Sequence, residues 1–272
     1  MPLAPLVATL LIVVAAALAK HLLLARPGLP TWPAYARTGL VGSPVRELAR
    51  ALVCVFTGLR ITHLRLYARN DADGTLGRLH YAYFPTALGY LGRTLEGLAP
   101  YAAGCLLLGL GTDLGLWVDA PPANWTQLAG WLPAALSAVL HGLLGMPGQG
   151  TPALLLLVGV LLVALHALPT PGDLRRMGHG LLMAVPLGLF VGALLWLVRE
   201  ARFPYVEGLF RRLEDSLLPA LHNAVAWLAV TGLALVVAAA LAALLGVLLP
   251  TLLGALLRRL LPRRTGSANP ER

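Results

Sequence analysis

The chain has 272 residues, of which 58% are hydrophobic and 12% charged, whereas soluble domains carry about 25% charged residues. Ionisable side chains are costly to insert into a bilayer core, so this composition indicates a membrane solvent and excludes an ordinary soluble domain. The formal net charge of +9 comes almost entirely from arginines that flank apolar runs. That pattern argues against nucleic-acid binding and for the cytoplasmic face of a membrane protein.

The N-terminal third predicts a span, a linker, a helix and a β-hairpin. Residues 3–19 are apolar throughout, with no basic region before them and no evident cleavage site, so they predict an uncleaved first span. Four prolines within residues 27–44 predict a loop or interfacial linker. Residues 45–59 predict a helix. Two alternating runs, joined by the turn signal from Asn70 to Gly74, predict a small hairpin over about 60–84 at the membrane surface.

The rest of the chain predicts apolar helices separated by polar segments. Residues 88–111 and 178–198 are long enough to span, and 220–249 form a longer apolar helix that Pro250 kinks. Partial spans are predicted where the apolar run is interrupted by Pro133 and His141 (127–145) or is short (153–168). The connecting segments are an interfacial loop at 113–126, a charged amphipathic stretch at 199–219, and a tail at 265–272 that we expect to be disordered.

Positive charge orients this arrangement. Residues 20–93 hold ten Lys or Arg and three acidic residues, so we expect this region, and the basic C-terminus, in the cytoplasm. The predicted fold is an all-α polytopic membrane domain over residues 1–264, with about five full spans and two partial ones, or five to seven in all, in a bacterial inner membrane. The sequence leaves open whether 45–59 and 127–145 cross fully.

Ionisable residues at the start of an apolar helix form the first candidate site. Arg46 and Arg50 lie one helical turn apart, with Glu47 directly after the first. In zinc proteases two histidines at this spacing bind the metal, and the intervening glutamate supplies the base. Guanidinium groups have no lone pair to give a metal. Taken alone, the pattern is also that of a positively charged helix end at the cytoplasmic interface.

Two further places put polar groups where hydrocarbon is expected. The segment from His166 to Asp173 breaks a helix with two prolines and a glycine, and broken backbone at membrane depth must be buried in protein or line a wet cavity. Asp173 is a candidate ligand, an ion-pair partner or the cap of the following helix. His166 alone is typical of a hydrogen-bonded packing histidine. Arg93 and Glu96 lie three residues apart on one helix and are expected to pair.

The order of these segments resembles the site-2-protease-like membrane metalloproteases, specifically a compact bacterial branch. VRELARALVCVFTGLRITHLRLY is similar to that branch's H-E-x-x-H helix with its following hairpin. DGTLGRLHYAY and LGRTLEGLAPYAAG resemble the glycine-containing hairpin and the G-x-x-P-x-x-x-G spanning helix. HALPTPGDLRRMGHG resembles the segment that supplies a third, aspartate, zinc ligand. The resemblance covers about residues 45–110 and 160–180.

The resemblance implies that Arg46 and Arg50 stand at the two histidine positions, Glu47 at the catalytic glutamate and Asp173 at the ligand aspartate. One protein ligand of the usual three would then remain, so we predict a pseudoprotease with no metal and no cofactor. Because an unpaired buried carboxylate is costly, Arg46 or Arg50 is expected to form a salt bridge with Asp173 where the metal would sit.

Three functions follow as hypotheses. The first is a non-catalytic scaffold or regulatory subunit that sits among membrane lipids and holds a membrane-protein partner, or another copy of itself, through the hairpin 60–84. The second is a transport or channel component, to which the broken helix near Asp173 would contribute. The third, least favoured, is an active protease that uses other ligands. The histidines available to it are His63, His80, His166 and His179.

Overall fold

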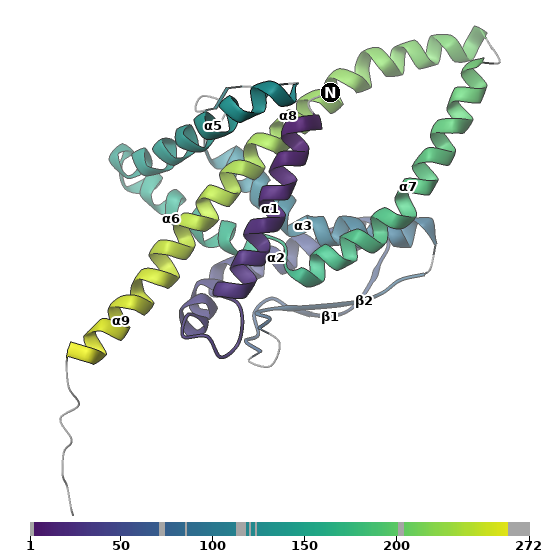
Figure 1. Ribbon diagram of the computed structural model, residues 1–272. Helices are drawn as coiled ribbons and strands as arrows, with labels where there is room; N and C mark the ends of the chain where they lie inside the picture. Colours follow the sequence, from purple (N-terminus) through teal and green to yellow (C-terminus); the bar gives the residue numbers. More distant parts are fainter. Residues whose placement is uncertain are drawn as a thin grey trace, which may run out of the picture.

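The computed structural model describes residues 3–70, 74–84, 86–112, 118–119, 121–122, 124–200 and 204–260. These residues form eight α-helices and one two-stranded antiparallel sheet (Figure 1), which confirms a mostly helical fold with a small hairpin. The helices are α1 (Leu3–Leu23), α2 (Trp32–Phe56), α3 (Ala87–Gly111), α5 (Trp125–Gly145), α6 (Thr151–Ala167), α7 (Pro171–Glu200), α8 (Pro204–Ala243) and α9 (Leu249–Leu260). The strands are β1 (Arg60–Arg65) and β2 (Arg78–Ala82).

Three helical stretches within the described residues are long and apolar enough to cross a membrane. They are Leu88–Gly111, Thr126–Gln149 and His222–Leu260. Helix α6 and the start of α7 (Pro171–Gly180) would add a fourth as one broken span, with a bend of 62° between them. Helix α1 forms where the first span is predicted, although its apolar stretch Val7–Leu23 is shorter than the usual span. The described part therefore supports fewer full spans than the five predicted.

Helix α2 corrects the prediction that residues 27–44 form a linker. It begins at Trp32, with Pro33 in its first turn where a missing N–H costs nothing, and continues through Pro44 to Phe56. Pro44 removes one backbone hydrogen bond from the helix interior. One face of α2, which includes Trp32, Tyr35 and Gly42, is buried. The packing of α2 against α6 offsets the free-energy cost of the lost hydrogen bond.

The structure also revises the predictions made at Pro133, over residues 199–219 and at Pro250. Helix α5 runs unbroken through Pro133, although an interruption was predicted there. The charged stretch 199–219 is not a separate element, because its described part from Pro204 onward is the start of α8. At Pro250, where a kink is predicted, a π-helical turn, η2 (Leu244–Leu248), leads from α8 into α9. A π turn is one way a helix accommodates a residue that cannot donate a backbone hydrogen bond.

The predicted hairpin is present and lies against α2. Strands β1 and β2 pair in antiparallel register with a bulge between Ile61 and His63. Beyond the strands, Ala68 N donates to Leu76 O over 2.8 Å, so pairing continues toward the turn. The Ser43 hydroxyl of α2 lies 3.0 Å from Leu66 O and 2.9 Å from Leu76 O, so it ties both arms of the hairpin to the helix. Half of the predicted loop 113–126 and all of the tail 265–272 lie outside the described residues.

Several helices pack around a main apolar core, and the far half of α7 departs from it (Figure 1). Figure 1 shows α1 beside α8, with α5 and α6 against α8, while the far half of α7 leaves the bundle and the start of α8 returns to it. A short 3-10 turn, η1 (Met146–Gln149), joins α5 to α6. Fully buried core side chains come from α3, α5, α6 and α8 and include Cys105, Leu108, Val139, Leu143, Ala164 and Leu233. The broken α6–α7 connection brings the start of α7 against α2 and α3 at one edge of this core.

Candidate functional site

One face of α2 presents three charged side chains to the interior. Glu47 is fully buried and Arg50 is 5% exposed, while the Arg46 side chain is 14% exposed. Gly77 permits this burial, because a Cβ built there would lie 2.6 Å from Glu47 Cγ, which is too close for any larger residue. The hairpin therefore packs closely over the charged face of α2.

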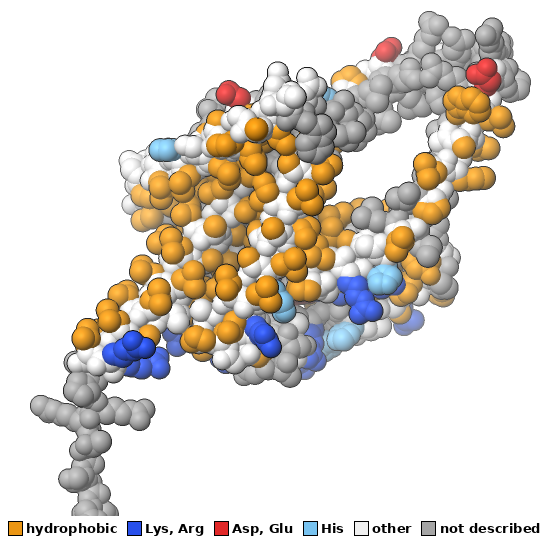
Figure 2. All heavy atoms as spheres, in the orientation of Figure 1, with side chains coloured by type: hydrophobic (Ala, Val, Ile, Leu, Met, Phe, Trp, Pro, Cys, Tyr) orange, Lys and Arg blue, Asp and Glu red, His pale blue; other side chains and the backbone are white. Residues whose placement is uncertain are grey.

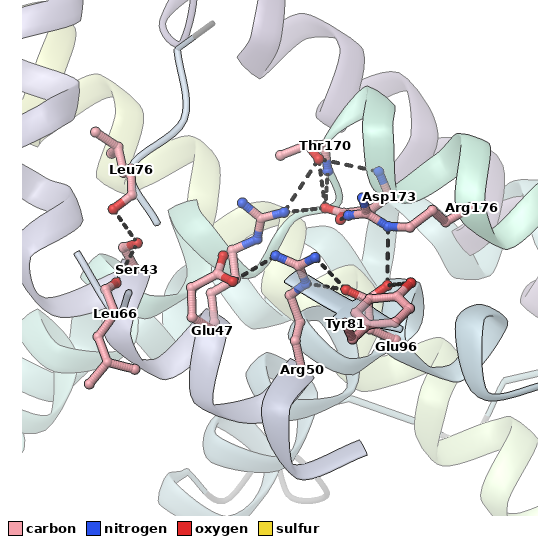
Figure 3. A network of polar contacts seen from close by, with 11 residues as sticks. Ser43, Glu47, Arg50, Leu66, Leu76, Tyr81, Glu96, Thr170, Asp173 and Arg176 are labelled. Atoms are coloured by element: carbon pink, nitrogen blue, oxygen red, sulfur yellow. Dashed lines mark hydrogen bonds and ion pairs between the residues drawn. The ribbon is translucent and has the colours of Figure 1, made fainter. Parts of the chain in front are cut away.

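Asp173, which is fully buried, is held by Arg46 and by its own helix start (Figure 3). An Arg46 nitrogen donates to Asp173 Oδ2, and Arg176 from the next turn of α7 donates to Oδ1. The same carboxylate accepts the Thr170 backbone N–H over 2.8 Å and the Thr170 hydroxyl over 2.7 Å. The Asp173 N–H lies 3.3 Å from the Thr170 hydroxyl oxygen, so Thr170 caps α7 and Asp173 completes a capping box.

Arg50 joins two further carboxylates. It donates to Glu47 Oε2 over 2.6 Å and binds Glu96 Oε1 of α3. The second Glu96 oxygen accepts the Tyr81 hydroxyl of β2 over 3.2 Å and lies 3.1 Å from Arg176 Nε. Gly97 allows α3 to come this close to α7, because a Cβ there would lie 3.1 Å from the Asp173 carbonyl oxygen.

These contacts form one network of three guanidinium groups and three buried carboxylates. Arg46, Arg50 and Arg176 alternate with Asp173, Glu47 and Glu96, and the residues come from α2, α3 and α7 (Figure 3). The formal charges cancel. A buried ion contributes favourably only when it is paired and hydrogen-bonded, so the network can hold three helices together without an ion from solvent.

The predicted ion pair between Asp173 and an arginine of α2 is present, and Arg46 is the arginine. The expectation that Arg93 pairs with Glu96 is wrong. Arg93 is turned outward, where it donates to the Tyr83 hydroxyl over 2.7 Å and lies over that ring. Glu96 turns inward, where the guanidinium groups of Arg50 and Arg176 face it. Proximity along the helix gives way to the larger benefit of neutralising a buried charge.

His166 is outside the ion network. Its Nε2 lies 3.1 Å from the Thr38 hydroxyl and its ring packs 4.7 Å from that of Tyr35, as a packing histidine does. Arg176 and Tyr81 belong to the network although the sequence did not single them out. Arg176 lies one turn after Asp173 on α7, a spacing that could have indicated it. Tyr81 carries no such signal, because its contact depends on how the hairpin folds over α3.

The donors at this site do not fit a zinc ion. Arg46 and Arg50 offer no lone pair, and both Asp173 oxygens already accept hydrogen bonds from arginines. Within the described residues no three His, Cys, Asp or Glu side chains are close enough together to hold a metal.

Burial, reinforced by the Glu96 carboxylate, raises the pKa of Tyr81 to about 12, so this phenol stays a proton donor at neutral pH.

A cavity of about 530 Å³ opens beside the network. It is bounded by the end of α1, the charged face of α2, residues 74–80 of the hairpin and the start of α7. Arg46, Glu47, Arg50 and Arg176 line it, together with Lys20. The candidate site is therefore a charged cavity, and on the side of the ion network the arginines in its wall are paired with carboxylates.

No protein-family description, curated protein or solved structure matches this chain.

Proposed function

We propose that this chain is an integral membrane scaffold with the arrangement of a metalloprotease and no catalytic role. One observation carries the proposal. The Arg46 guanidinium binds the Asp173 carboxylate, at the point where the resemblance puts a metal between these positions. A guanidinium there supplies the positive charge that the buried aspartate needs and supplies no electrophile for hydrolysis.

The arrangement of charge supports a membrane setting. On the face drawn in Figure 2, the Lys and Arg side chains gather along one edge of the molecule and the few Asp and Glu side chains visible there lie toward the opposite edge, with hydrophobic side chains between them. Glu47, Glu96 and Asp173 are buried and do not contribute to this surface pattern. Lys and Arg concentrate on the cytoplasmic side of membrane proteins. Helix α9 ends at the basic edge with Arg258 and Arg259, which favours a multi-pass protein of the bacterial inner membrane with a cytoplasmic C-terminus.

The hairpin is the docking element in this proposal. The sheet contains two strands, so each strand has an outer edge that the sheet itself leaves open, and such an edge can accept a strand from a partner. Strand β2 also borders the charged cavity, since Arg78, Leu79 and His80 line it. A membrane-protein partner, or a second copy of the chain, would meet the scaffold here.

Site-specific photo-crosslinking in native membranes tests this role. A photoreactive amino acid replaces His80, which is exposed on β2, and in a matched control it replaces Leu252, which is exposed on α9. We expect one defined crosslinked species from position 80, recovered in fixed ratio to the chain, and none of that species from position 252. Equal labelling from both positions, or no stoichiometric partner in affinity purification, would contradict the scaffold role.

The bend between α6 and α7 favours a second candidate, a component of a transport system. The 62° break lies beside the charged cavity, and broken helices at membrane depth form solute sites in transporters. Solute flux into proteoliposomes that contain the purified chain would support this candidate over the scaffold. Metal analysis addresses the remaining hypothesis, an active protease, since one bound zinc per chain would revive it.

A further inference from the structure

Three polar groups along the charged cavity have hydrogen-bonding capacity that the described residues do not use. Glu47 Oε1 and Arg46 Nε are buried and have no hydrogen-bond partner there. The Lys20 ammonium has three N–H groups and donates to Leu168 O over 2.6 Å. Both Glu47 and Lys20 are at least nine-tenths buried and line the cavity. A buried polar atom without a partner is costly, so these groups point to a ligand.

Charge at the cavity favours an anionic ligand. The lining includes the cations Lys20, Arg46, Arg50, Arg78 and Arg176, and among the described residues its one carboxylate is Glu47. Behind the wall, Asp173 and Glu96 offset two of these cations. Lys20 forms no ion pair with the described residues and donates only to a backbone carbonyl, so its positive charge favours an anionic ligand.

An apolar groove begins where the charged cavity ends. This groove of about 160 Å³ lies between α1, α6 and α8, and Lys20 lines both spaces. The other lining side chains are aliphatic, namely Ala16, Ala19, Leu23, Leu24, Leu165, Leu168, Val236, Ala239, Ala240, Ala243 and Leu248. Leu23 is 61% exposed at its rim, so the groove opens outward. A charged cavity continued by an aliphatic groove is complementary to a lipid.

We propose that the cavity and the groove together bind one anionic glycerophospholipid. The phosphate lies against Lys20 and Arg46 Nε, a headgroup hydroxyl donates to Glu47 Oε1, and an acyl chain occupies the groove between α1 and α8. Lys20 is in the last turn of α1, which runs toward the basic edge (Figures 1 and 2). Basic pockets between helices on that side recognise acidic lipid headgroups. The inference rests on the proposed membrane setting but not on the scaffold role.

Lipid binding is measured as the concentration dependence of thermal stability in detergent. The purified full chain is titrated with phosphatidylglycerol, phosphatidylethanolamine or phosphatidylcholine, and in separate arms with glycerol 3-phosphate and inorganic phosphate. We expect phosphatidylglycerol to raise Tm saturably, and the other two lipids to bind at least about fivefold more weakly. Equal effects of all three lipids would overturn the proposal. Glycerol 3-phosphate or phosphate that binds as tightly as phosphatidylglycerol would assign the site to a soluble anion instead.

Two variants separate the headgroup from the acyl chain. Lys20→Met keeps the aliphatic stem and should weaken phosphatidylglycerol binding about five- to tenfold, whereas Arg26→Ala, an exposed cation six residues later, should leave it unchanged. Ala19→Trp adds bulk at an exposed position of the groove, so it should fold normally and weaken lipid binding alone. Wild-type affinity in both Lys20→Met and Ala19→Trp would refute the site. A missing crosslink at His80 would refute the scaffold role and leave the lipid site standing.

Discussion

Replacing Asp173 with asparagine tests the ion network most directly. The substitution keeps the shape of the side chain but removes a buried charge that Arg46 and Arg176 share, so three guanidinium groups would face two carboxylates. Removing one partner of a buried pair costs about 3–5 kcal/mol because the other charge is left uncompensated. We therefore expect the free energy of unfolding to fall by about 3–5 kcal/mol. Tryptophan fluorescence in mixed micelles with increasing SDS measures it.

A double variant distinguishes charge balance from simple loss of contacts. Arg46→Leu combined with Asp173→Asn leaves two cations and two carboxylates, so its destabilisation should be smaller than the sum of the single effects by about 1–3 kcal/mol. Arg93→Ala is the control, since its contact with Tyr83 is exposed and should contribute less than about 1 kcal/mol. Additive single effects, or a loss from Asp173→Asn no larger than that from Arg93→Ala, would refute the reasoning.

Three other predictions follow from the same geometry. Glu96→Gln should lower the free energy of unfolding by about 3–5 kcal/mol in the same unfolding assay, because Arg50 loses its buried partner. The Tyr81 pKa is raised from 10 to about 12, so the folded chain holds this proton more tightly. The stability that it contributes should be complete below pH 10 and lost as the pH rises toward 12, and ultraviolet titration should show the pKa returning toward 10 in Glu96→Gln. Arg46→His with Arg50→His exchanges two guanidinium charges for the double charge of zinc beside Asp173, so elemental analysis should find about one zinc per chain, whereas an apo variant would count against the family resemblance.

Apolar length and alternation were sufficient to predict several elements. The apolar helix at 88–111 and the hairpin at 60–84 are present because each is encoded in a local run of side chains. The predicted linker at 27–44 is wrong from residue 32 onward, because the prediction gave the prolines more weight than burial of the segment. Tertiary packing decided the outcome, since Tyr35 and Gly42 lie on the buried face of α2 and burial there opposes the lost hydrogen bond at Pro44.

The site was predictable only where sequence spacing and charge balance agreed. The resemblance brought Arg46 and Arg50 next to Asp173, whose buried carboxylate needs a cation, and Arg46 is the one that binds it. The partners of Glu96 could not be found in this way, because Arg50 lies on another helix and the local candidate Arg93 is turned outward. Which of several arginines reaches a carboxylate depends on helix rotation and on close approaches such as that at Gly97, and these are properties of the assembled bundle.

The capping box at the start of α7 fixes the polarity of the ion pair. Asp173 accepts the Thr170 N–H as well as the Arg46 guanidinium, and a cation in its place could accept neither and would oppose the positive end of the helix dipole. Exchanging the two charges, with aspartate at 46 and arginine at 173, would restore attraction on paper but leave the first turn of α7 without its acceptor. The two positions are thus not interchangeable, and substitutions that keep this contact intact must retain the acid on α7 and the base on α2.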